Sequence, residues 1–149
     1  MTLRGTYAIP APRDTVWQRL MDPQTLARAL PGCEKIEPQP DGSFGAEMKI
    51  GIAAVRGTYK GRVEILDPVP PDRYRIKVEG KGSGGFVKGE GTLELSENAS
   101  GTLIAYSGEA QVGGVIASVG QRLLEAAARQ IVGKFFEAFA QQVATARHG

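Results

Sequence analysis

The stretch VIASVGQRLLEAAARQIVGKFFEAFAQQVATA, residues 115–146, decides how the rest of this 149-residue chain can fold. It contains no proline, and residues with high helix propensity dominate it. At about 1.5 Å per residue, the region 114–146 predicts a helix on the order of 45 Å long, enough to cross a small domain. Two glycines, Gly120 and Gly133, lie inside this region, and Gly133 allows a bend in the expected helix.

The apolar face of the expected helix changes direction partway along. In the first half one side carries Ile116, Val119, Gly120, Leu123 and Ala127. In the second half the apolar stripe is turned by roughly a quarter of a circle and consists of Ile131, Val132, Phe135, Phe136 and Phe139. This change predicts that one half covers a sheet and the other packs on a different element. A long amphipathic core helix with an incidental glycine is the alternative interpretation.

The size and composition of the chain favour one soluble cytoplasmic domain spanning residues 1–149. Its 18 basic and 16 acidic residues leave a net charge of +2, which gives no strong attraction to nucleic acid. A single cysteine excludes an internal disulfide. The N-terminus lacks a continuous apolar region of a secretory signal, and no run approaches the roughly 18 apolar residues of a transmembrane helix.

The rest of the sequence predicts an α+β fold with seven antiparallel strands. A first strand runs through Leu3–Ile9, and proline start signals at Pro12 and Pro23 predict two short helices after it. From Cys33 onward apolar and polar residues alternate, which predicts strands at 33–38, 43–52, 55–66, 73–82, 86–97 and 102–112. Short turn sequences separate these strands, and parallel pairing would need longer crossovers, so we expect sequential antiparallel hairpins.

The apolar, inward face of the expected sheet contains many residues that are too small to fill a core. Seven glycines fall on it: Gly5, Gly57, Gly61, Gly80, Gly89, Gly91 and Gly108. The facing helix is similarly thin at Gly120 and Ala127. Because natural cores pack at crystal density, small residues on both walls predict a ligand cavity. Glycines that allow a strongly curved sheet to bend are the alternative explanation.

The same inward face carries all four tyrosines and no charged residue. Tyr7, Tyr59, Tyr74 and Tyr106 would give aromatic walls with a few hydroxyl groups, or they would lie at sheet margins with their hydroxyls in water. Cys33 has no histidine partner in the pattern, and no spacing of residues indicates a metal site. Catalysis is therefore less favoured than binding, with no required cofactor.

The opposite face of two strands has an excess of basic residues. Arg56, Lys60, Arg62, Arg73, Arg75 and Lys77 stand there against two acidic residues, Glu64 and Glu79. A solvated strand face is the ordinary explanation. The functional alternative is a docking patch for an acidic partner or an anionic membrane surface.

Several motifs, spread over nearly the whole chain, carry a family resemblance. They are Asp22-Pro23, Leu30-Pro31-Gly32-Cys33, the segment 56–63 (RGTYKGRV), Lys88-Gly89-Glu90-Gly91, Gly101-Thr102, and Val112-Gly113-Gly114 with Ala117, Gly120 and Arg122. With them the chain resembles the carbon monoxide dehydrogenase G-subunit (CoxG) family of the helix-grip, START-like (SRPBCC) superfamily. The resemblance implies a curved antiparallel sheet wrapped around the long C-terminal helix.

The resemblance also implies a non-catalytic accessory protein of an aerobic molybdenum carbon monoxide dehydrogenase system, in peripheral contact with the inner face of the cytoplasmic membrane. Together with the inward face it predicts a quinone or lipid bound between sheet and helix. The expected ligand-binding residues are Tyr7, Met48, Ile50, Tyr59, Tyr74, Ile76, Gly89, Ile104, Tyr106, Val119, Leu123, Ala127, Ile131 and Phe135. Two alternatives stay open: a cyclase- or dehydratase-type enzyme that uses the tyrosines with a loop carboxylate, and a docking adaptor without a ligand.

Overall fold

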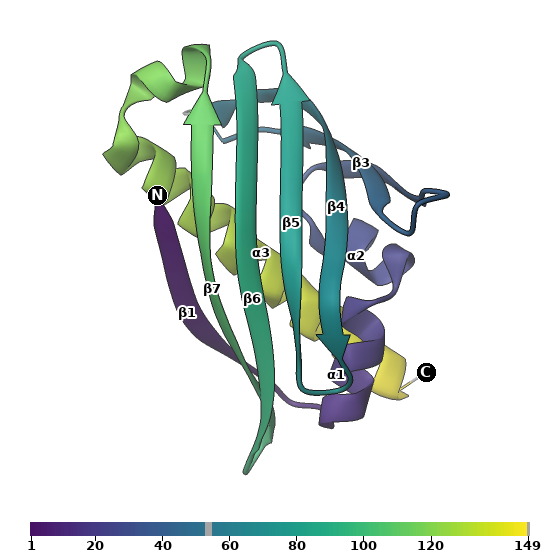
Figure 1. The fold of residues 1–149 in the computed structure, drawn as a ribbon. Coiled ribbons are helices and arrows are strands. Elements are labelled where there is room, and N and C mark those ends of the chain that lie inside the picture. The colour runs from purple at the N-terminus through teal and green to yellow at the C-terminus, as the bar shows by residue number, and fades with distance from the viewer. Residues whose placement is uncertain (53–54, 149) are drawn as a thin grey trace.

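Seven strands form one antiparallel sheet that curves around a long helix in the computed structural model of the chain (Figure 1). The structure describes residues 1–52 and 55–148, except for the side chains of 145–148. The strands are β1 (Thr2–Ile9), β2 (Cys33–Pro38), β3 (Phe44–Ile50), β4 (Gly57–Val69), β5 (Arg73–Gly82), β6 (Gly85–Asn98) and β7 (Gly101–Gly113). Their order in the sheet is β1-β7-β6-β5-β4-β3-β2, so each strand after β2 pairs with its neighbour in sequence and β1 closes against β7.

The helices lie on one side of this sheet. They are α1 (Arg13–Leu20), α2 (Pro23–Ala29), the short 3-10 helix η2 (Val115–Val119) and α3 (Gln121–His148). Figure 1 shows α3 crossing diagonally behind β7, β6 and β5 and ending beside α1. The expected α+β architecture, with two short helices after the first strand and a sheet that grips a long C-terminal helix, is confirmed.

The long helix begins later than the sequence pattern predicts. Gly120 has a φ of +96°, and Gly114 has a φ of +84°, so both adopt a backbone conformation that residues with a side chain rarely take. Gly114 precedes η2 and Gly120 separates η2 from α3, which starts with the bond from the Leu124 N–H to the Gly120 carbonyl. The expectation of one helix from residue 114 was therefore wrong for its first turns. At Gly133, where the sequence allows a bend, α3 continues without a break.

The best-packed part of the interior lies at the α1 end of the sheet. The side chains there that are at most 1% exposed include Ile9, Val16, Leu20, Ile104, Phe139 and Val143. They come from β1, α1, β7 and the C-terminal half of α3 and belong to one contiguous core. This end of the molecule is closed by packing, whereas the residues farther along the sheet toward η2 are partly exposed.

Several inward glycines allow the sheet to curve. A Cβ atom added at Gly61, Gly91 or Gly108 would lie 2.8 Å from a backbone carbonyl oxygen of the neighbouring strand. Any side chain there would push adjacent strands apart, so curvature, the alternative explanation, accounts for these three. Gly80 differs, because a Cβ atom at that position would meet no heavy atom nearer than 4.0 Å. Open space and backbone curvature therefore each explain part of the glycine pattern.

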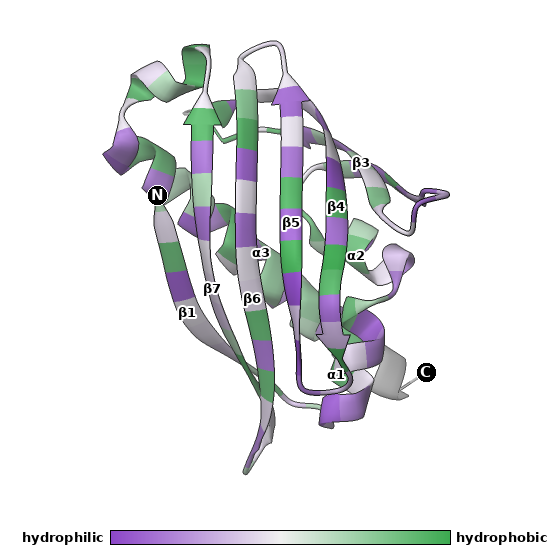
Figure 2. Cartoon of the chain, viewed as in Figure 1, coloured by the Kyte–Doolittle hydropathy of each residue, from purple (hydrophilic) through white to green (hydrophobic). Residues whose placement is uncertain are grey.

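The outer face of the sheet is charged along its whole length, and Figure 2 shows the alternation of hydrophilic and hydrophobic residues along β4 and β5. The expected basic patch is offset by acidic residues from the same strand, from neighbouring strands and from turns. Arg62 pairs with Asp41 and Glu64, and Arg75 with Asp67. Lys60 forms an ion pair with Glu47 at 3.8 Å. In the register of the sheet Arg73 is opposite Glu94. Lys77 is opposite Glu64 on one side and Glu90 on the other. Arg56 precedes β4 and is exposed. This mixed surface gives a docking adaptor little support.

Candidate functional site

A cavity of about 340 Å³ lies between the inner face of the sheet and the helices. We call it the sheet–helix cavity. It is lined by Leu20 from α1; Leu26 and Leu30 from α2 and its end; Ile36, Phe44, Ala46 and Met48 from β2 and β3; Tyr59, Gly61, Arg62, Val63 and Ile65 from β4; Tyr74, Ile76, Val78, Glu79 and Gly80 from β5; Leu93 and Tyr106 from β6 and β7; and Ile131, Val132, Phe135 and Phe136 from α3. Its wall is almost entirely aliphatic and aromatic.

Half of the residues predicted to bind a ligand border this cavity. They are Met48, Tyr59, Tyr74, Ile76, Tyr106, Ile131 and Phe135. Ile104 lies in the closed core instead, and Tyr7 stacks on Phe136 outside the cavity wall. Ile50, Gly89, Val119 and Ala127 do not border the cavity either. Leu123 is 54% exposed, because the helical face that would have directed it inward ends at Gly120.

The wall that sequence reasoning missed comes from the two short helices and β2. Leu26 and Leu30 lie four residues apart, which places them on one side of α2, and both border the cavity. Ile36 lies on the half-buried side of β2 and also borders it. The signal for Leu26 and Leu30 was present as helical spacing. The sequence did not show that this short helix would fold over the cavity and cover it.

The position of α2 is fixed at its first residue. Asp22 caps the helix: one of its carboxylate oxygens accepts a hydrogen bond from the Gln24 N–H at 3.3 Å, and the other accepts from the Thr25 hydroxyl at 2.7 Å. These bonds, led by that from Thr25, hold the pKa of Asp22 below its ordinary value. Pro23 follows at the first helical position, where its missing N–H has no partner to lose. The cap therefore orients the helix that carries Leu26 and Leu30.

The turn after α2 joins this helix to the sheet. Gly32 has a φ of +71°, and its carbonyl accepts a hydrogen bond from the Lys49 N–H at 2.8 Å. A Cβ atom at Gly32 would lie 1.9 Å from the Lys49 carbonyl oxygen. The backbone of this turn thus touches β3 directly, and glycine is required there for both the conformation and the contact.

Stacked aromatic rings form the α3 side of the site. The ring of Phe136 lies between those of Tyr7 and Tyr106, with centroid distances of 5.2 and 5.4 Å. Phe135 meets Phe136 edge to face at 5.0 Å and stacks on Phe139 at 5.8 Å. Such contacts fix the ring positions, so the wall is preformed. The predicted inward placement of the tyrosines is correct, because Tyr7 and the three cavity tyrosines all contact the interior.

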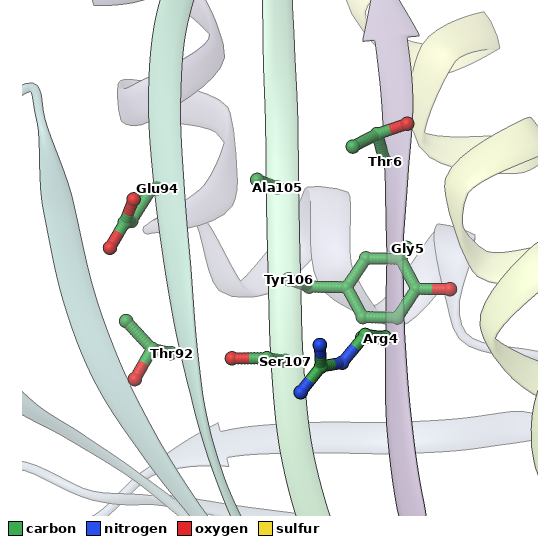
Figure 3. Close-up of a pocket in the computed structure, with 8 residues that line it drawn as sticks. All are labelled: Arg4, Gly5, Thr6, Thr92, Glu94, Ala105, Tyr106 and Ser107. Carbon is green, nitrogen blue, oxygen red and sulfur yellow. The ribbon is translucent and has the colours of Figure 1, made fainter.

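The hydroxyls of the cavity tyrosines have different surroundings. The Tyr59 hydroxyl donates to the Val55 carbonyl oxygen at 2.9 Å. The Tyr106 ring passes beneath β1 at Gly5, where an added Cβ atom would lie 2.6 Å from the hydroxyl oxygen (Figure 3). Tyr74 is 3% exposed, its ring meets Trp17 edge to face at 5.4 Å, and its hydroxyl makes no hydrogen bond with a residue that the structure describes. Burial raises the pKa of Tyr74, so this hydroxyl stays protonated.

Charged groups at the cavity margin are engaged elsewhere. The Arg62 guanidinium donates to the Asp41 carboxylate and, at 3.1 Å, to the Ser43 hydroxyl oxygen, and it lies 2.9 Å from Glu64. Glu79 is an exposed residue of the outer face. Among the described residues, no carboxylate makes a hydrogen bond to a cavity tyrosine. The catalytic alternative needs that arrangement, so it gains no support here.

The Cys33 thiol is not activated as a nucleophile. It is half-buried and donates to the Lys35 carbonyl oxygen at 3.6 Å. Burial raises the pKa of this thiol, which disfavours the nucleophilic thiolate. Within residues 1–52 and 55–148, no three His, Cys, Asp or Glu side chains are grouped so that they could hold a metal ion.

A second hollow lies on the outer face of the sheet. Figure 3 shows it between β6, β7 and β1, bordered by Arg4, Thr6, Thr92, Glu94, Ala105 and Ser107, with the Tyr106 ring at Gly5. Polar and charged side chains make up most of its rim. It is separated by the sheet from the apolar cavity and offers no arrangement of groups suited to acid–base or nucleophilic chemistry.

Similar folds occur in solved structures. A conserved protein from Geobacillus kaustophilus shares 34% identity with this chain at a TM-score of 0.93, covering 97% of this chain and 96% of that one. A START superfamily protein from Mycobacterium smegmatis has a TM-score of 0.73 at 13% identity, covering 97% of each chain. A Thermus thermophilus protein also has a TM-score of 0.73, at 16% identity, covering 98% of this chain and 99% of that one. These likenesses agree with a START-like helix-grip fold.

Family membership follows from the match between the sequence and a family model. No curated protein matches the chain. The model of the carbon monoxide dehydrogenase G-subunit (CoxG) family matches residues 5–144, a range that contains nearly all of the sheet, both short helices and almost all of α3. The matched range includes the Leu30-Pro31-Gly32-Cys33 turn and the glycine-spaced strands that shape the cavity. The chain therefore belongs to the CoxG family.

Proposed function

We propose that this protein is a non-catalytic accessory protein that binds a hydrophobic small molecule, a quinone or a lipid, in the sheet–helix cavity. The observation that carries the proposal is the apolar, preformed hollow of about 340 Å³ under α2 and α3. Small-molecule sites are typically concave, of roughly 300–1,000 Å³, and apolar with a few polar groups. An interior filled by side chains would have left no room for a ligand.

The family suggests the partner. The name of the family associates its members with carbon monoxide dehydrogenase, and this supports an accessory role for a molybdenum hydroxylase of that type. A protein that holds a quinone could accept it from the membrane and offer it to such an enzyme as electron acceptor. In this proposal the enzyme carries out the redox chemistry, and the present chain supplies a dry, apolar compartment.

The ligand is tested directly on the purified protein. Native mass spectrometry, followed by extraction into organic solvent, should show a bound apolar molecule in a 1:1 complex. Protein freed of ligand should regain it on titration with a short-chain quinone, followed by quenching of Trp17 fluorescence, because Trp17 contacts the cavity residue Tyr74. An unoccupied protein that binds neither quinones nor lipids in titration would contradict the proposal.

We further propose that the end of the molecule around η2 contacts an anionic membrane surface. Four large apolar side chains are exposed among the described residues, and three of them, Phe86, Val115 and Leu123, lie at this end. We call these three the apolar tip. Lys88 lies 5.9 Å above the Phe86 ring, and Lys81 is opposite Phe86 in the sheet. Apolar side chains beside lysines suit the interface of a bilayer with anionic lipids.

The location of the cavity agrees with this contact. Tyr59, a cavity residue, pairs with Gly82 at the end of β5 that leads into Phe86. One end of the cavity thus lies toward the apolar tip, and a ligand that leaves or enters there would do so close to the bilayer. No helix of the described segments is long and apolar enough to cross a membrane, so the proposed contact is peripheral.

Serine substitutions at the apolar tip test this contact. The triple variant Phe86→Ser, Val115→Ser, Leu123→Ser should lose most of its co-sedimentation with vesicles of phosphatidylcholine and phosphatidylglycerol, because it removes the apolar area that inserts. Val69→Ser is the matched control, since Val69 is 41% exposed at the opposite end of β4. Equal vesicle binding by wild type and triple variant would contradict the contact.

A further inference from the structure

The Tyr74 hydroxyl stands out among the polar groups of the interior. Tyr74 lines the sheet–helix cavity, is 3% exposed, and has no hydrogen-bond partner among the residues that the structure describes. The oxygen of this hydroxyl is not completely sealed off, because Arg13 Nε is the fully buried side-chain polar atom that lacks a partner among the described residues. Water can therefore reach the Tyr74 hydroxyl while the cavity holds no ligand. A ligand that fills the cavity excludes this water, and the unpaired hydroxyl then costs free energy unless the ligand supplies a partner.

The other cavity tyrosines do not have a free hydroxyl inside. That of Tyr59 is occupied by the Val55 carbonyl oxygen, and that of Tyr106 lies against Gly5 of β1. The guanidinium of Arg62 is held by three partners outside the cavity. Tyr74 therefore remains as the polar group able to bind a guest within the described wall. Its ring is fixed edge to face against Trp17, so the hydroxyl is held in place before any ligand arrives.

The shape of the cavity limits the ligand to a slender molecule. Tyr74 and Gly80 both border the cavity and are six residues apart on β5, which corresponds to roughly 20 Å along the strand. A volume of about 340 Å³ distributed over that length fits a chain-like molecule better than a compact one. Tyr74 belongs to the closed core end, whereas Tyr59 and Gly80 lie toward the apolar tip. The polar end of the ligand would thus be innermost.

We propose that the Tyr74 hydroxyl donates a hydrogen bond to an acceptor oxygen, such as a carbonyl, at the inner end of an elongated apolar ligand, and that this bond selects such molecules over plain hydrocarbons. The inference rests on the proposed ligand-binding function and adds the chemical class of the ligand and its orientation. Selection arises because a hydrocarbon leaves the hydroxyl unpaired, whereas a carbonyl satisfies it.

The test compares two probes and three proteins. The probes are a benzoquinone with a ten-carbon alkyl chain, which carries acceptor oxygens, and an alkylbenzene with the same chain, which carries none. Wild type should bind the quinone more tightly, and Tyr74→Phe should weaken quinone binding roughly tenfold while leaving alkylbenzene binding unchanged. Ser107→Ala, which removes a hydroxyl on the outer face of the sheet, should change neither affinity.

The outcomes separate this inference from the proposed function. If Tyr74→Phe binds the quinone as tightly as wild type, or weakens both probes equally, Tyr74 does not select the ligand, and the cavity still binds apolar molecules. If wild type binds neither probe, the ligand-binding function fails and the inference fails with it. The melting temperature of the ligand-free Tyr74→Phe protein should equal or exceed that of wild type, which a purely structural role of the hydroxyl would not give.

Discussion

A protein carrying Gly80→Ile is expected to fold normally and to lose its ligand. Gly80 borders the sheet–helix cavity, and a Cβ atom there would meet no heavy atom nearer than 4.0 Å, so the new side chain grows into the space that the ligand would occupy. The affinity for an apolar ligand should fall more than tenfold, which corresponds to at least about 1.4 kcal/mol. Stability should stay equal or rise by about 1 kcal/mol, since β-branched residues favour strands and glycine does not.

Gly89→Ile is the matched control for this variant. Gly89 lies on the same inward face, opposite Val78, but does not border the cavity, and a Cβ atom there would be 3.4 Å from its nearest neighbour, the Glu109 carbonyl oxygen. Ligand titration should show weakened binding for Gly80→Ile alone, and circular dichroism should show the same fold for both. Unchanged affinity in Gly80→Ile would mean that the ligand binds elsewhere.

Gly32→Ala should be the most destabilising single-methyl change in the turns of this protein. The added Cβ atom would lie 1.9 Å from the Lys49 carbonyl oxygen, and the φ of +71° is unfavourable for alanine. The backbone of β3 cannot move without breaking the bond from Lys49 to Gly32. We expect a loss of ~3 kcal/mol or more in the free energy of unfolding, typical of steric conflict at a special backbone conformation. In a chain of this length the melting temperature should fall by roughly 10 °C.

Gly42→Ala separates the effect of the unfavourable φ from the effect of the steric contact with Lys49. Gly42 has a φ of +87°, but no heavy atom lies within 4 Å of the position of its Cβ atom. This variant should therefore lose only the conformational part, about 1 kcal/mol, in thermal or urea unfolding. Similar losses at both positions would show that the contact with Lys49 is relieved by movement of the turn. Because Gly32 holds α2 against β3, ligand affinity should fall with stability in Gly32→Ala and stay constant in Gly42→Ala.

The alternation of side chains made the sheet predictable. Each strand from Cys33 to Val112 places apolar and polar residues on opposite faces, and this pattern is local, so the strands agree with the structure to within a few residues. Turn sequences between the strands are short enough to enforce antiparallel neighbours. The prediction of family and fold followed from the same residues, because the glycine-spaced strands and the Leu30–Cys33 turn lie within the range 5–144 that the family model matches.

The sequence pattern failed where local conformation depends on a single residue. The helical spacing of Ile116 and Leu123 indicated one continuous face, but the positive φ of Gly120 ends η2 and turns Leu123 toward solvent. The predicted basic patch came from counting charged residues on one face of β4 and β5 without the ion pairs that the folded chain forms. In the structure Arg62 pairs with Asp41 from the turn before β3 and with Glu64 of β4 itself, and Arg75 pairs with Asp67 near the end of β4.

The sequence by itself determined that this chain is a helix-grip protein with an uncharged, aromatic inner face, because periodicity, proline and glycine positions act within a few residues of each other. Tertiary structure alone decided which side chains enclose the cavity: it brought Leu26 and Leu30 over the sheet and placed Ile104 in the closed core. It also left the Tyr74 hydroxyl without a partner among the described residues. Whether a buried group finds a hydrogen-bond partner depends on residues that are far apart in the sequence and close in space. No local sequence pattern shows which of them come together.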